Sequence, residues 1–139
     1  MKKIVLIVLI MSSFLFSNVG IVKNTTGEVD VKRGKNIVSI KAGDSLENGD
    51  IIMTKSKSSI GITFDDGTVL SLDEKAIFII NKFKVKPEKK EFDVDLYLKK
   101  GKAIFSSGRV GKLAPKSVKF RIPEGIIGIR GTKFAVEVK

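Results

Sequence analysis

The chain has 139 residues, with 26 lysines and arginines against 15 acidic residues, and it contains no histidine and no cysteine. Without these two residue types there is no disulfide, no thiolate nucleophile, no Ser-His-Asp triad and no ordinary zinc or copper site. The length fits a single domain. We therefore expect a protein that is not an enzyme and that needs no cofactor and no metal.

The first 17 residues are predicted to be a signal peptide. Lys2 and Lys3 precede an apolar run over residues 4–16, which is shorter than the roughly 20 residues of a transmembrane helix. Ser17 is the expected last residue before cleavage, and Gly20 is the second choice. An uncleaved membrane anchor is the alternative. We expect an exported protein, periplasmic or secreted, that meets the membrane only if this signal helix is uncleaved.

The positive charge invites an anionic partner. Lys2 and Lys3 leave with the signal peptide, so the remaining chain has 24 basic and 15 acidic residues and a net charge of +9. Such a charge favours an anionic partner such as nucleic acid, anionic lipid headgroups or an acidic polymer of the cell envelope. Nucleic acid is not expected, because only four of the cations are arginines and base recognition favours the planar arginine fork. A lysine-rich solvated surface is the simpler alternative.

Beyond residue 26 the sequence predicts strands almost throughout. Polar and apolar residues alternate with period two, which indicates a strand with one buried and one wetted face. The alternating runs cover residues 27–31, 59–64, 92–98, 117–122 and 133–138. No segment carries a helical apolar stripe of 12 or more residues.

Turn residues separate these runs. Asp66-Gly67 predicts a tight hairpin, because glycine adopts the positive φ that the turn requires. Gly49-Asp50 and Gly101 are also interpreted as turns between strands, and the charged segment Lys84–Glu91 as an exposed hairpin tip. The predicted fold is all-β, with many short strands in a compact β-roll, solenoid-like or sandwich domain that follows the N-terminal signal helix.

Three segments taken together resemble the FecR-type domain, an extracytoplasmic β-domain first known from ferric-citrate signalling regulators. They cover residues 27–46, 48–72 and 122–134, and the resemblance as a whole covers residues 27–138. The terminal R-G-T-x-F pattern is the most specific element. The motif residues that we single out are Gly49, Asp50, Asp66, Gly67, Gly128, Arg130, Gly131, Thr132 and Phe134.

The resemblance implies a periplasmic module that binds a protein partner or an envelope component in signalling or envelope assembly. Transmembrane regulators of this type act on a sigma factor through a cytoplasmic segment, whereas only Met1, Lys2 and Lys3 precede the apolar run here. We therefore expect any signal to pass through another protein. The alternative function is a carbohydrate- or peptidoglycan-associated structural protein held partly by its basic surface.

Several carboxylates lie close together in the sequence. Asp44, Glu47 and Asp50 fall within seven residues, and Asp65 and Asp66 are adjacent. Carboxylate oxygens are calcium ligands, but the spacing does not fit an EF-hand loop. Asp beside Gly is ordinary turn chemistry, since the side chain caps nearby backbone N–H groups. We expect turn structure here and no metal.

The segment around Arg130 has two interpretations. Gly131 permits a backbone conformation closed to other residues, and Arg130 is suited to a two-pronged bond with a ligand carboxylate. The favoured interpretation is internal: Arg130 pairs with Asp50 or Asp66 and fastens the last strand to an earlier turn, while Thr132 satisfies backbone groups.

Overall fold

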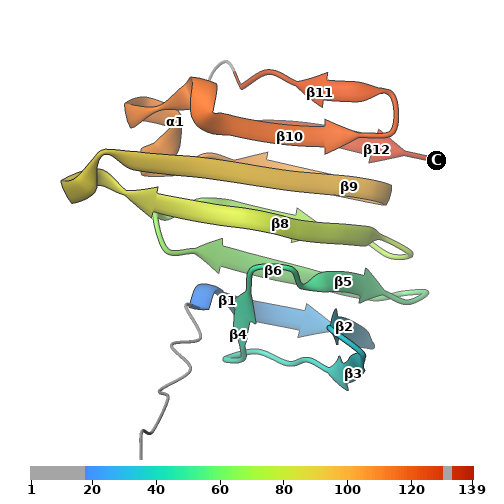
Figure 1. The fold of residues 1–139 in the computed structure, drawn as a ribbon. Helices are drawn as coiled ribbons and strands as arrows, with labels where there is room; N and C mark the ends of the chain where they lie inside the picture. The colour runs from blue at the N-terminus through green and yellow to red at the C-terminus, as the bar shows by residue number, and fades with distance from the viewer. Residues whose placement is uncertain (1–17, 130–132) are drawn as a thin grey trace, which may run out of the picture.

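The computed structural model describes residues 18–129 and 133–139, and in these residues the protein is all-β, as predicted (Figure 1). The strands are β1 (Asn18–Thr26), β2 (Val29–Arg33), β3 (Asn36–Ser39), β4 (Ser45–Glu47), β5 (Ile51–Thr54), β6 (Ser59–Phe64), β7 (Val69–Leu72), β8 (Ile77–Lys86), β9 (Glu91–Ser106), β10 (Val118–Ile122), β11 (Gly125–Ile127) and β12 (Lys133–Val138). The helical turns are η1 (Pro87–Lys89), α1 (Arg109–Leu113) and η2 (Pro115–Ser117). No helix in this part of the chain is long and apolar enough to cross a membrane.

The strands form one curled sheet that folds over on itself along β9. Residues 91–100 of β9 pair with β8, whereas residues 101–106 pair with β7 or β12. We call the two parts the β8 half (β3, β2, β5, β8, the first part of β9, β10 and β11) and the β7 half (β4, β1, β6, β7, the last part of β9 and β12). The strand pairs are antiparallel, apart from the parallel pair of β10 with β9.

The bend of β9 corrects one prediction. Gly101 was expected in a turn between two strands, but it lies inside β9 with a φ of +101°. A Cβ atom there would come within 2.6 Å of the Cα atom of Ala76. Because glycine tolerates both the positive φ and this close approach, one strand continues from the β8 half into the β7 half without ending.

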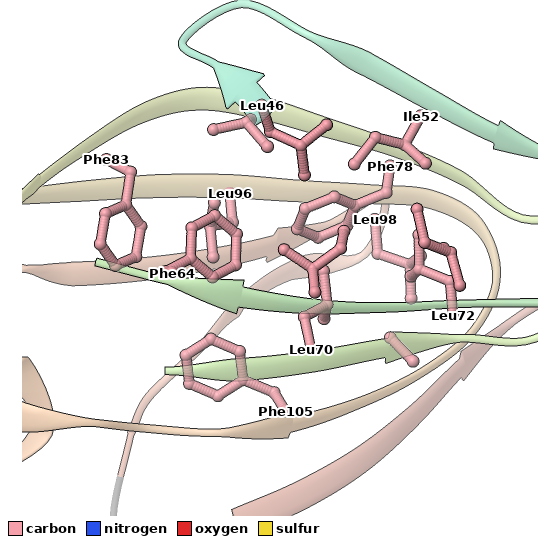
Figure 2. Close-up of a cluster of buried hydrophobic side chains, with 14 of the residues drawn as sticks. Leu46, Ile52, Phe64, Leu70, Leu72, Phe78, Phe83, Leu96, Leu98 and Phe105 are labelled. Carbon is pink, nitrogen blue, oxygen red and sulfur yellow. The ribbon is translucent and has the colours of Figure 1, made fainter. Parts of the chain in front are cut away.

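The core lies between the two halves of the sheet. Figure 2 shows side chains from both halves meeting there: Phe78, Phe83, Leu96 and Leu98 of the β8 half face Phe64, Leu70 and Leu72 of the β7 half. Every second residue of β9 from Val94 to Leu98 is fully buried, which is the alternation predicted from the sequence. Apolar burial on this scale is the main stabilising contribution in a chain without disulfides.

Two predicted turns are confirmed. Asp66-Gly67 joins β6 to β7, and Gly67 has a φ of +86°. The charged segment Lys84–Glu91 contains the tip between β8 and β9, where η1 forms. The short helix α1 was not anticipated, because its five residues are too few to show an apolar stripe.

The first strand lies upstream of the predicted start of the domain at residue 27. β1 pairs with β4 and with β6, and Val19 and Val22 belong to the core. Residues 1–17, which carry the predicted signal peptide, lie outside the described residues. Cleavage after Ser17 would leave β1 whole, whereas cleavage after Gly20 would remove the buried side chain of Val19.

Candidate interaction surface

Asp50 of the first predicted motif is buried and holds an arginine. It is 0 % exposed, and its carboxylate accepts hydrogen bonds from Arg33 Nε at 2.9 Å and Arg33 Nη2 at 2.8 Å. It also accepts the backbone N–H of Glu47 at 2.9 Å. The hydrogen bond with Asp50 raises the pKa of Arg33. The motif therefore ties β2 to the turn between β4 and β5.

Asp66 of the second motif is a structural cap. Its Oδ1 atom accepts the backbone N–H of Thr68 at 2.9 Å, and its Oδ2 atom accepts that of Val110 at 3.0 Å. The Thr68 hydroxyl accepts the backbone N–H of Gly108 at 3.0 Å. The turn between β6 and β7 thus holds the start of α1, about 40 residues further along the chain.

The terminal motif is described only in part. Arg130, Gly131 and Thr132 lie outside the described residues, so the proposed pairing of Arg130 stays a prediction. The described carboxylate contacts of Asp50 and Asp66 are those given above. Gly128 is exposed, with open space around it.

Phe134, the last motif residue, joins the two halves of the sheet. Its ring centroid lies 5.2 Å from that of Phe105 in β9 and 5.2 Å from that of Phe120 in β10. Phe134 itself lies in β12 of the β7 half, whereas Phe120 lies in the β8 half. Its role in the described structure is packing.

The carboxylates near Asp50 in the sequence make separate contacts. Asp44 accepts the backbone N–H of Lys41 at 2.9 Å, which is the expected turn geometry. Glu47 lies 3.1 Å from Arg33. Among the described residues no three carboxylates gather in a group that would hold a metal ion.

The charged form of Asp65 is disfavoured by its surroundings. Desolvation and, to a smaller extent, the adjacent charge of Asp66 raise the pKa of Asp65.

The outer face of the β8 half carries a contiguous row of apolar side chains. Ile51, Ile79 and Tyr97 are direct neighbours across β5, β8 and β9. Met53 and Ile77 form the next pair along the same strands. All five are half-buried, and the described helices lie at one end of the sheet and leave this face open (Figure 1).

Ion pairs border this apolar row. Asp95 binds Arg121 at 2.9 Å on one side. Lys55 lies 3.6 Å from Asp30 on the other side. An apolar centre with a polar rim is the usual anatomy of a protein–protein interface.

The outer face of the β7 half is different. Ile21, Val69 and Ile104 are 50 %, 42 % and 39 % exposed. They do not form a row, because Thr63 stands between Ile21 and Val69 in the strand register. Scattered apolar side chains of this kind are normal on a protein surface.

The row was not predicted from the sequence, because each strand was expected to have one wetted face. The signal was present in two places where apolar residues follow one another without alternation: Ile51–Met53 and Ala76–Ile80. A short unbroken apolar run is typical of a strand that is covered on both faces.

The comparisons with known proteins agree with the resemblance seen in the sequence. Residues 50–139 match the protein family described as FecR protein. The match begins at the buried Asp50 and covers β5 to β12. No curated protein and no solved structure matches the chain.

Proposed function

The chain belongs to the FecR protein family, and we propose that it is a signalling-related module of the periplasm that binds a protein partner and catalyses no reaction. The observation that carries this proposal is the apolar row on the outer face of the β8 half. Family membership supports a regulatory role in signalling. The apolar row is the surface that we expect to contact the partner.

The composition of the row supports a protein partner. Tyr97 is the single tyrosine of the chain, and it stands at the end of the row, between Ile79 and Arg121. Tyrosine and arginine are enriched in the small set of residues that dominate binding energy at interfaces. The side chains also lie on strands, which hold them in fixed positions and reduce the entropy lost on binding.

Export and the lack of catalysis belong to the same proposal. The basic start and apolar run of residues 1–17 support export to the periplasm. The absence of histidine and cysteine from the whole sequence supports a binding role, because the commonest general acid–base and nucleophilic side chains are missing.

Site-specific photo-crosslinking in living cells tests the proposal. A photoreactive amino acid replaces Ile79 or Tyr97 in the full chain, and Ser71, an exposed residue on the outer face of the β7 half, is the matched control. We expect one discrete crosslinked protein from positions 79 and 97 and none from position 71.

Ile79→Lys places a charge at the centre of the row without touching the core. We expect it to abolish the crosslink from position 97 while the melting temperature changes little. The proposal is wrong if all three positions give the same products, or if Ile79→Lys leaves the crosslink intact. A polymer-bound structural protein, the alternative function, would give no discrete protein crosslink and would sediment with cell walls in a salt-dependent manner.

A further inference from the structure

The positive charge of this protein is concentrated in one segment. Residues 96–123 contain eight basic residues and no acidic residue, against a net charge of +9 for the chain beyond the predicted signal peptide. These cations are Lys99, Lys100, Lys102, Arg109, Lys112, Lys116, Lys119 and Arg121. The rest of that chain is therefore close to neutral, and any attraction to an anionic partner arises mainly here.

The helical part of this segment forms a protruding basic lobe, which we define as residues 107–117. Arg109, Lys112 and Lys116 are exposed on it. Leu113 stands between Lys112 and Lys116 in the sequence and is 55 % exposed. Val110 is 0 % exposed and fastens the lobe to the core.

The cations of the lobe lack carboxylate partners among the described residues. None of the ion pairs in the structure includes Arg109, Lys112 or Lys116. All 15 acidic residues belong to the described part of the chain, since residues 1–17 and 130–132 contain none. The lobe therefore presents its full charge to an external anion.

The lobe lies at the end of the sheet where β1 begins. The backbone N–H of Asp65 donates to the carbonyl of Val19 at 3.0 Å, and the adjacent Asp66 binds the backbone N–H of Val110 at 3.0 Å. One turn thus connects the start of β1 with α1, and Figure 1 shows both at the same end as the tip between β8 and β9. The apolar residues 4–16 immediately precede this end of the chain.

We propose that the basic lobe binds an anionic phospholipid membrane, with Arg109, Lys112 and Lys116 on the headgroups and Leu113 inserted among them. Cations near an anionic membrane surface are attracted to it additively, and an apolar side chain gains by leaving water. A soluble polyanion would need the three cations but not the exposed leucine.

The absence of cysteine makes a local test simple. A single cysteine at position 113 or at the control position 37 carries an environment-sensitive fluorophore in the full chain. Ile37 is a fit control because it is 62 % exposed on β3, an edge strand remote from α1. Each labelled protein is mixed with vesicles of phosphatidylglycerol and phosphatidylcholine, or of phosphatidylcholine alone, that contain a lipid-borne quencher. The N-terminal segment is common to both proteins, so the difference between the two labels reports the lobe.

We expect quenching at position 113 with anionic vesicles only, and none at position 37. The label is then moved to Pro115→Cys, an exposed position within the lobe, so that residue 113 can be varied. Arg109→Ser, Lys112→Ser and Lys116→Ser together lower the equilibrium constant for lobe–lipid contact roughly 100-fold, and Leu113→Ser lowers it about tenfold. The matched control replaces Lys23, Lys35 and Lys41, which are exposed and bring the same change in net charge. It leaves the contact nearly unchanged.

Three results would overturn the inference: equal quenching at positions 113 and 37, an equal loss in the two triple variants, or quenching that is independent of phosphatidylglycerol. A fourth is binding of soluble polyglutamate or polyphosphate that needs the three cations but is unaffected by Leu113→Ser, with no lipid contact at position 113. That outcome identifies a polyanion site instead. Because the lobe is separate from the apolar row, the crosslink from position 97 is retained in both triple variants, so failure here is distinguishable from failure of the proposed function.

Discussion

Replacing Asp66 with alanine separates the turn between β6 and β7 from helix α1. The wild-type carboxylate satisfies two backbone N–H groups, those of Thr68 and Val110, at 2.9 and 3.0 Å. Both of these residues are 0 % exposed, so water cannot take the place of the lost carboxylate without an opening of the structure. The substitution therefore leaves two buried donors without an acceptor.

An unsatisfied buried donor costs about 1–3 kcal/mol, and bonds to a charged acceptor lie at the upper end. We expect Asp66→Ala to lower the free energy of unfolding by about 3–5 kcal/mol. That is a large part of the roughly 5–15 kcal/mol by which domains of this kind are stable. Asp66→Asn keeps one acceptor oxygen and turns an NH₂ group toward the other donor, so we expect about half of the effect.

Urea unfolding followed by circular dichroism measures these differences, and amide hydrogen exchange at Val110 reports the local opening of α1. Asp65→Ala is the control, because Asp65 is the exposed neighbour and its side chain caps nothing in the described structure. Equal stability of the Asp66→Ala and Asp65→Ala proteins, or unchanged exchange at Val110, would refute the reasoning.

Three further substitutions test other parts of the structure. Asp65→Asn stabilises the protein at neutral pH, because the raised pKa means that the charged carboxylate destabilises the fold there. The wild type gains stability as the pH falls from the pKa of Asp65 in the folded state toward its pKa in the unfolded state. At a pH below both pKa values, urea unfolding gives the same free energy of unfolding for the wild type and the variant. Arg33→Ala lowers the free energy of unfolding by about 2–3 kcal/mol, since it leaves the buried Asp50 without its cation. Arg33→Lys restores less than half of the lost stability, because lysine lacks the two-pronged geometry of arginine. Full restoration of the stability by lysine would contradict this account. Gly101→Ala forces a Cβ atom to 2.6 Å from a buried backbone atom and lowers the free energy of unfolding by more than about 3 kcal/mol. Gly34→Ala, where φ is also positive but the space is open, lowers it by about 1 kcal/mol. Similar melting temperatures for the two variants would show that β9 bends by another means.

The two proposed binding surfaces lie on different parts of the protein. The apolar row lies on strands of the β8 half, and the basic lobe follows the end of β9 in the β7 half. A protein partner on the first and a membrane on the second would leave each other's sites free. The two proposals can therefore be tested one at a time in the same protein.

The sequence by itself determined the all-β class, the hairpin at Asp66-Gly67 and the alternating burial of β9. These features depend on residues within a few positions of one another, and local backbone preference and apolar period are sufficient to encode them. The family likeness also followed from the order of short turn motifs, and residues 50–139 match that family.

Only the tertiary structure decided which distant groups meet. Arg33 lies beside Asp50, whereas the sequence motifs suggested Arg130 as a partner of Asp50 or Asp66. Ile51, Ile79 and Tyr97 became neighbours because β5, β8 and β9 pair in a particular order and register. Strand order and register depend on how the whole core packs, and a shift of one residue would turn each of these side chains to the other face. Local patterns show that Ile51–Met53 and Ala76–Ile80 are apolar without alternation, but they do not show which strands are neighbours, so the row itself appears only when the sheet is assembled.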